Sequence, residues 1–179
     1  THQSIDDIAI MRVIPNMTVL EVGDATEVES VLDIAHAIDG PVYVRMLRGE
    51  VPRLFETPME FNQARVLTRA GEDINEPADI VIVTSGICTE EAMRAVPAIV
   101  DRGLKVTHLH VSTLKPFSDP TVTAALASAR KGVITMENHL VTGGLGSAVA
   151  EVMAENAIAV PLSRIGLNDT YAHGASLPY

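Results

Sequence analysis

The sequence predicts an α/β protein: a three-layer α/β sandwich with a mostly parallel sheet, preceded by an incomplete α/β domain. Strand-like apolar runs alternate with helical patterns along the 179 residues, which is the order of βαβ units. The run 78–84 is almost continuously apolar, as expected of a parallel strand covered on both faces. Hydrophobic residues make up 47% of the chain and aromatic residues only 3%, so the core must be mainly aliphatic.

Residues 1–49 are expected to form the incomplete domain. A helix-like stretch stops at Pro15-Asn16, and the next helix starts near Thr26, which we expect to cap its first-turn amides. The Asp-Gly-Pro turn at 39–41 ends this second helix. The strands predicted over the whole chain are 17–22, 42–46, 79–84, 105–111, 133–137 and 160–165. Two strands and one full helix cannot cover both faces of a sheet, so the first unit is expected to pack on structure absent from this sequence, on the second domain or on another subunit.

Residues 50–77 predict a linker, because they carry Pro, Gly and mixed charges with weak periodicity. Residues 78–179 predict a self-contained domain of about four strands and three helices. We expect Thr89 to cap its first helix, which ends near Gly103. Asp119-Pro120 predicts another helix start, since Asp is a good N-cap and Pro is tolerated at the first helical position.

Composition and charge narrow the classes of partner. The formal net charge is −10 and the thirteen Lys and Arg are scattered, which argues against nucleic acid. The single cysteine, Cys88, excludes an internal disulfide and is typical of a reducing cytoplasm. No run approaches the ~18 apolar residues of a membrane span. A cytoplasmic protein without a membrane or nucleic-acid partner is therefore predicted.

Six motifs carry a resemblance to a known family. They are Thr1-His2-Gln3, Ile14-Pro15-Asn16, Asp39-Gly40-Pro41, Leu47-Arg48-Gly49, the strand Ala78–Ser85, and Ile134–Asn138 followed by Gly143–Ser147. Their order and spacing resemble those of transketolase-like thiamine diphosphate enzymes over essentially the whole chain. Those enzymes have a pyrophosphate-binding, a pyrimidine-binding and a C-terminal domain. This chain resembles the last third of the second domain and all of the third, so sequence before Thr1 is expected to be missing.

The resemblance implies an activity and its partners. It implies a transketolase that transfers a two-carbon ketol unit between sugar phosphates with thiamine diphosphate and magnesium. The family's cofactor-activating glutamate and ring-stacking aromatic lie upstream of the Thr-His-Gln loop, so the cofactor is expected to be bound mainly by residues absent from this chain. The expected partner is an N-terminal transketolase part or subunit, in a homo-oligomer or heterotetramer. The chain alone is expected to be inactive.

The resemblance also implies two site residues. His2 corresponds to the histidine of the family's substrate channel and is assigned as catalytic. Arg48 corresponds to the arginine that binds substrate phosphate. A guanidinium just after a strand can hold a phosphate with two hydrogen bonds, and strand ends are where α/β sheets place ligands. Arg45 lies on the opposite strand face and is expected to be structural.

Other functions remain open from sequence. 1-Deoxy-D-xylulose-5-phosphate synthase shares the architecture, although Gln3 favours transketolase, because the synthases usually carry a second histidine there. The beta subunit of 2-oxoacid dehydrogenases is disfavoured, since it usually lacks the arginine of Leu47-Arg48-Gly49. A non-catalytic assembly or regulatory module would explain the acidic composition and the incomplete first domain.

Three further patterns have structural explanations that we favour. The Gly143–Ser147 loop resembles a dinucleotide-binding turn, but position 149 is Val where a third glycine is needed, so a tight turn is expected. His108, His110 and His139 could approach one another around zinc, but hydrogen-bonded histidines at the sheet end are favoured. Cys88 lacks a basic neighbour and is expected to be a packing residue. No residue of the chain is assigned to a metal or cofactor.

Overall fold

The computed structural model describes residues 4–171 and confirms the predicted α/β class with mostly parallel strands. The helices are α1 (Asp7–Val13), α2 (Ala25–Ala37), α3 (Cys88–Val100), α4 (Pro120–Ser128) and α5 (Leu145–Glu155). The strands are β1 (Thr18–Glu21), β2 (Val42–Arg45), β3 (Arg65–Thr68), β4 (Ala78–Thr84), β5 (Val106–His110), β6 (Thr113–Lys115), β7 (Ala129–Leu140) and β8 (Leu162–Leu167). No helix within residues 4–171 is long and apolar enough to cross a membrane.

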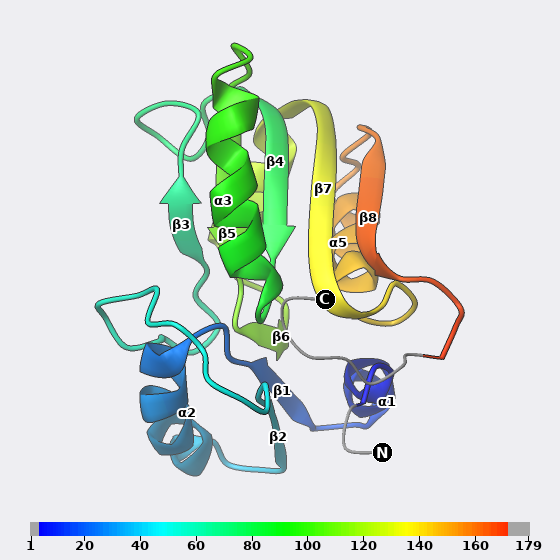
Figure 1. Cartoon of the computed structure of the whole chain (residues 1–179). Coiled ribbons are helices and arrows are strands. Elements are labelled where there is room, and N and C mark those ends of the chain that lie inside the picture. The colour runs from blue at the N-terminus through cyan, green and yellow to red at the C-terminus, as the bar shows by residue number, and fades with distance from the viewer. Residues whose placement is uncertain (1–3, 172–179) are drawn as a thin grey trace.

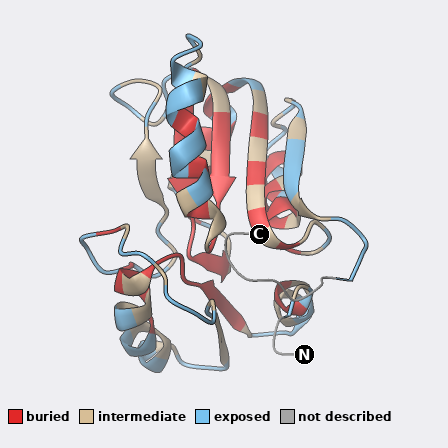
Figure 2. Ribbon diagram, viewed as in Figure 1, coloured by how far each residue is buried: buried red, intermediate tan, exposed pale blue. Residues whose placement is uncertain are grey.

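The larger sheet has five strands in the order β3-β5-β4-β7-β8 and forms the middle layer of a sandwich (Figure 1). The strands β5, β4, β7 and β8 are parallel, and β3 joins the edge antiparallel to β5. On one face, Ile82 packs with Ala92 and Val96 of α3. On the other face, Val81 and Val83 share a core with residues of α4 and α5. β4 is therefore buried along most of its length, as its apolar run predicts (Figure 2).

The smaller sheet has three strands in the order β2-β1-β6. β2 is parallel to β1, whereas β6 is antiparallel and comes from the chain between β5 and α4. Leu20 and Val31 form an apolar cluster between β1 and α2. Val19 joins Ile8 of α1 in the main core. The first unit thus obtains its third strand and part of its core from the rest of the chain, as the two-strand argument predicted.

Two short strands were not predicted. β3 lies inside the segment 50–77, where a linker was expected, and the same segment buries Phe55 and Met59. β6 follows β5 after only two residues. β6 (Thr-Leu-Lys) has one apolar residue and β3 (Arg-Val-Leu-Thr) has two, so neither carries the apolar run by which the other strands were predicted.

Two helix starts also differ from the prediction, and one agrees. Asp24, not Thr26, caps α2, because its Oδ1 accepts from the Glu27 N–H at 2.8 Å. Thr89 lies inside α3, and its hydroxyl contacts Thr84 and His110 instead of capping the helix. The predicted cap of α4 is confirmed, since Asp119 Oδ1 accepts from the Thr121 N–H at 2.9 Å.

Candidate functional site

The carboxyl ends of strands from both sheets meet between the two units. β4 points toward the smaller sheet (Figure 1). A Cβ placed on Gly86, just after β4, would lie 2.8 Å from Glu21 Oε1 at the end of β1. Arg45, at the end of β2, donates from Nη2 to the Asn138 carbonyl of β7 at 2.8 Å. Because ligands of α/β proteins bind beyond the carboxyl ends of parallel strands, this junction is the candidate site.

Arg45 forms the centre of the junction. Its Nε donates to Asp7 Oδ2 at 3.0 Å, and its Nη1 pairs with Glu21 Oε1. Tyr43 Oη donates to the same Asp7 oxygen at 2.7 Å. Burial would raise the pKa of Asp7, but the Tyr43 hydrogen bond and the Arg45 charge bring that pKa below its usual value. The expected structural role of Arg45 is confirmed by these contacts.

Arg48 lies three residues after β2, in an exposed bend. Gly49 follows with φ of +142°, a conformation that side chains rarely adopt. Within residues 4–171 the Arg48 guanidinium makes no hydrogen bond or ion pair, so it is available to an anionic ligand. His2, the other predicted site residue, lies outside the described residues. Phosphate binding by Arg48 and catalysis by His2 both stay predictions.

A second polar cluster, which sequence reasoning missed, joins α2 to the larger sheet. Glu27 Oε2 accepts from the Gly23 N–H at 2.9 Å and lies 3.0 Å from His110 Nε2. Glu27 Oε1 accepts from Ser112 Oγ at 2.7 Å and from Arg65 Nε at 3.0 Å. Burial would raise the pKa of Glu27, but the hydrogen bond and charge of His110 outweigh it and hold that pKa well below its usual value.

This cluster contains a serine, a histidine and a glutamate, which are the residue types of a hydrolase triad. The side chains of Glu27 and His110 are fully buried, and Ser112 is 3% exposed. A nucleophile must reach its substrate, so these residues cannot act as one. The cluster is therefore a link between the two units.

The three histidines considered for zinc do not converge. β4 lies between β5, which carries His108 and His110, and β7, which carries His139. His108 Nε2 bonds Thr84 Oγ1 at 3.0 Å, and His139 Nδ1 lies 2.7 Å from the Leu140 carbonyl oxygen. Burial lowers the pKa of His108 to about 4. The described residues contain no group of three or more His, Cys, Asp or Glu arranged for a metal ion. The favoured interpretation, hydrogen-bonded histidines, is confirmed.

The glycine loop before α5 is a tight turn closed by Glu137. The carboxylate of Glu137 accepts from the Leu145 N–H at 2.7 Å and from the Gly146 N–H at 2.9 Å. A Cβ on Gly144 would lie 1.9 Å from Glu137 Oε2, so glycine is required for this approach. The helix amides that a dinucleotide phosphate would need are already occupied. The dinucleotide interpretation is therefore wrong, and the tight turn is confirmed.

Cys88 is half-buried, and burial raises the pKa of its thiol to about 12. A thiol with that pKa stays protonated at neutral pH and is a poor nucleophile. A packing role, as predicted, fits these observations.

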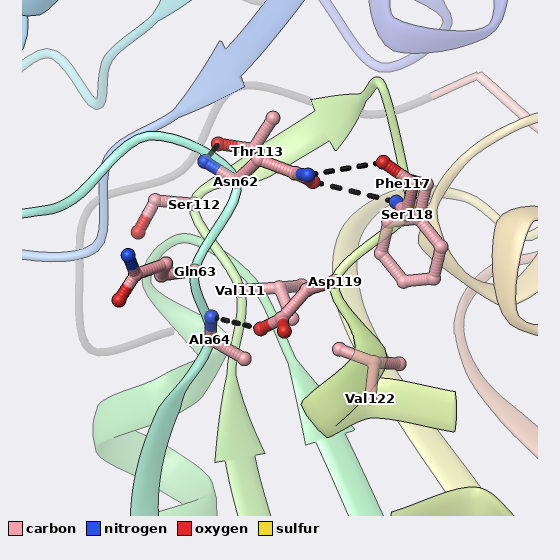
Figure 3. A pocket seen from close by; sticks show the side chains of 10 residues that line it. All are labelled: Asn62, Gln63, Ala64, Val111, Ser112, Thr113, Phe117, Ser118, Asp119 and Val122. Carbon is pink, nitrogen blue, oxygen red and sulfur yellow. Dashed lines mark hydrogen bonds between the residues drawn. The ribbon is translucent and has the colours of Figure 1, made fainter. Parts of the chain in front are cut away.

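One depression in the surface lies where the segment 62–64 meets the start of α4 (Figure 3). Asn62 Nδ2 donates to Ser118 Oγ at 3.0 Å, and Asp119 Oδ2 accepts from the Ala64 N–H at 2.6 Å. The cavity has a volume of about 10 Å³. That volume holds one water molecule at most, so the depression is not a substrate site.

A family model of the transketolase C-terminal domain matches residues 53–178, and one of the transketolase pyrimidine-binding domain matches residues 1–53. A solved structure described as a split gene transketolase, inactive beta4 tetramer, superimposes with a TM-score of 0.85 at 35% identity. That superposition covers 96% of this chain and 55% of the other.

Two curated relatives extend the comparison. A 6-deoxy-6-sulfo-D-fructose transketolase subunit from Clostridium sp. (strain MSTE9) is 39% identical over 96% of this chain and 51% of its own length. A 1-deoxy-D-xylulose-5-phosphate synthase from Listeria innocua is 34% identical over 99% of this chain and 28% of its own length. The chain thus spans about half the length of the transketolase relative that it matches. With both family models matched in order and the fold shared, the chain belongs to the transketolase family.

Proposed function

We propose that this chain is part of a thiamine-diphosphate-dependent transketolase that transfers a two-carbon ketol unit between sugar phosphates. In this proposal the chain binds the anionic end of the sugar and joins the subunits. The observation that carries it is the position of Arg48, which is exposed three residues after β2, the strand whose last residue, Arg45, lies at the junction.

Arg48 suits the ends of the sugars that two relatives are named for. One relative is named for a sulfo-sugar and the other for a sugar 5-phosphate. Both groups present oxyanions that a planar guanidinium can hold with two parallel hydrogen bonds. We therefore assign the terminal phosphate of the substrate to Arg48. His2 remains the proposed second substrate contact.

The diphosphate and metal of the cofactor are assigned in this proposal to residues outside the described chain. Carboxylates already occupy the amino ends of three helices: Asp24 at α2, Asp119 at α4 and Glu137 at α5. The described residues also lack a cluster arranged for a metal ion. The proposal therefore assigns thiamine diphosphate and magnesium to an N-terminal transketolase part or subunit, with which this chain forms a larger oligomer.

Synthesis of 1-deoxy-D-xylulose 5-phosphate is the second candidate function. The relative from Listeria innocua favours it, because its identity of 34% extends over 99% of this chain. The two activities differ in the donor. A transketolase consumes a ketose phosphate, whereas the synthase consumes a 2-oxoacid, so donor specificity separates them.

The test uses the full-length protein together with its N-terminal partner, thiamine diphosphate and magnesium. Ketol transfer is measured with a ketose phosphate and with the same ketose lacking phosphate. We expect Arg48→Ala to lower kcat/KM for the phosphorylated donor by about 10- to 150-fold, since a charged hydrogen bond contributes ~1.5–3 kcal/mol. The unphosphorylated donor should be unaffected.

Arg94→Ala is the matched control, because Arg94 is an exposed arginine of α3 that pairs only with Glu90 and Glu91 among the described residues. An equal loss for both donors would contradict phosphate binding by Arg48. Turnover of a 2-oxoacid but not of a ketose phosphate would favour the synthase, and no turnover of either would favour a non-catalytic module.

A further inference from the structure

The guanidinium of Arg45 contacts four residues in three separate segments of the chain. Nε and Nη1 bind the carboxylates of Asp7 in α1 and Glu21 in β1. Nη2 donates to the carbonyl oxygens of Ser4 at 2.9 Å and of Asn138 in β7 at 2.8 Å. The side chain of Arg45 is 14% exposed. One side chain thus connects the start of the described chain, both strands of the first unit and the larger sheet.

Arg45 is also the last anchored residue before Arg48. Among residues 4–171, β1 is the only strand that pairs with β2 in the smaller sheet, so β2 lies at an edge. The Arg45 carbonyl accepts from the Val22 N–H at 3.2 Å. The next backbone hydrogen bond along the described chain is made by the Pro52 carbonyl, which accepts from the Ala25 N–H at 3.3 Å. The bend that carries Arg48 is therefore held by backbone hydrogen bonds only at its two ends, Arg45 and Pro52, within the described chain.

The contacts among Arg45, Asp7 and Glu21 leave two buried carboxylate oxygens without a partner in the described chain. One guanidinium faces two buried carboxylates, and Asp7 Oδ1 and Glu21 Oε2 have no hydrogen-bond partner in the described chain. A buried carboxylate oxygen without a partner is unfavourable, and buried ion pairs can often be replaced by apolar residues without loss of stability. What the contacts of Arg45 do define is the position of the end of β2 relative to Ser4, Asp7, Glu21 and Asn138.

We propose that Arg45 is a positioning residue that holds the Arg48 bend in place for substrate phosphate. The proposal rests on the function proposed above. The side chain of Arg45 is mostly buried and its three nitrogens are already hydrogen-bonded, so in this proposal it does not touch the substrate. It fixes the end of β2 against the segment 4–7 and against β7, which sets where the Arg48 guanidinium stands relative to the junction.

A lysine cannot reproduce this arrangement. Arg45 uses three nitrogens in a planar fork to reach four acceptors on different sides. An ammonium group has three donors on a single atom and cannot reach all four. Arg45→Lys keeps the positive charge between Asp7 and Glu21 but removes the geometry. The Arg45→Lys variant therefore tests the positioning role of Arg45 while the charges of Asp7 and Glu21 stay neutralised.

The test compares Arg45→Lys and Arg45→Met with the control Arg94→Met in the full-length protein with its partner. The first measurement is the phosphate preference, the ratio of kcat/KM for a phosphorylated ketose to that for its unphosphorylated form. We expect both Arg45 variants to lower this ratio about tenfold and Arg94→Met to leave it unchanged. An unchanged ratio in a folded, active Arg45→Lys protein would overturn the proposal, because a purely structural role would affect both substrates equally.

The second measurement is hydrogen exchange, which does not depend on activity. Arg45→Lys should speed exchange at residues 4–9 and 46–51 and leave residues 106–110 of β5 unchanged. If the wild-type assembly shows no phosphate preference, the proposed function fails. Hydrogen exchange then tests by itself whether Arg45 holds the bend that carries Arg48. Unchanged hydrogen exchange at residues 46–51 would then overturn the positioning role of Arg45. Faster exchange at these residues would support that role.

Discussion

His110 Nε2 and Glu27 Oε2 lie 3.0 Å apart although 83 residues separate them in the chain. Both side chains are fully buried. Glu27 belongs to α2 of the first unit and His110 ends β5 of the larger sheet. The pair therefore connects the two units at a point that solvent does not reach, and the protonation of Glu27 is linked to the stability of the fold.

Glu27→Gln is expected to change the acid sensitivity of the fold. His110 and the other donors lower the pKa of Glu27 from 4.5 to about 2. A carboxyl group with a lowered pKa stabilises the folded state above its unfolded pKa, and this stabilisation is lost as the pH falls through the folded pKa. The wild type should therefore exceed Glu27→Gln in free energy of unfolding at pH 7, by about 3 kcal/mol. The difference should shrink between pH 4.5 and 2.

Denaturant unfolding at a series of pH values measures this difference. Glu29→Gln is the control, because Glu29 lies two residues away on α2 and pairs with Arg53 at the surface. Its effect should be small. A gap between wild type and Glu27→Gln that stays constant from pH 7 to 2 would show that the carboxylate charge is not the source of the stabilisation.

Gly144→Ala is expected to destabilise the start of α5. The added methyl group would lie 1.9 Å from Glu137 Oε2 and 2.8 Å from His139 Nδ1, and both of those side chains are buried. Overpacking of this kind lowers the free energy of unfolding by about 1–3 kcal/mol. Thermal unfolding measures the effect.

Gly71→Ala provides the comparison. Its methyl group would also meet a glutamate, Glu76, but that residue is exposed and its side chain can move. We expect a markedly smaller loss there. Equal losses at Gly71 and Gly144 would mean that the Glu137 carboxylate does not hold the loop rigidly.

Asp119→Ala should loosen two segments together. Asp119 Oδ1 caps α4 through the Thr121 N–H, and Oδ2 accepts from the Ala64 N–H just before β3 (Figure 3). Loss of an N-cap typically lowers the free energy of unfolding by about 1 kcal/mol, and an unpaired amide adds to that loss. Hydrogen exchange should increase at Ala64 as well as at Thr121. Asp119→Asn keeps a carbonyl oxygen for the cap, so the Thr121 amide should stay better protected from exchange than the Ala64 amide. If Asp119→Ala reduces protection at Thr121 alone, Asp119 does not hold both segments.

Most of the secondary structure could be predicted from sequence because six of the strands lie in apolar runs. β3 and β6 could not, since β3 contains two apolar residues and β6 one, and each is fixed by its partner, β5 or β1. Thr26 and Asp24 are both good N-cap residues. The tertiary structure favours Asp24 as the cap, because its carboxylate also accepts from the distant amides of Leu54 and Phe55, both at 2.8 Å. The local sequence does not reveal these contacts.

The site was predictable in part. Strand alternation from Arg45 predicted a structural role for that residue, which its contacts confirm, although β2 ends at Arg45 and alternation does not extend to Arg48. Nothing in the local sequence marks Glu27 as buried, because its spacing after Asp24 looks like that of an ordinary first-turn glutamate on a solvated helix. Its partners Arg65, His110 and Ser112 come from distant segments, and only the tertiary fold brings them to one carboxylate.

β6 makes residues 113–115 a structural member of the sheet to which residues 18–21 belong. The two family models meet at residue 53, yet a cut there would remove β6 and leave β1 and β2, among the described residues, as a pair of strands with both outer edges unpaired. The border between the two models is therefore not a border between folding units. Expression of either half alone should give an aggregation-prone product, and fusion or exchange of parts should keep β6 with β1.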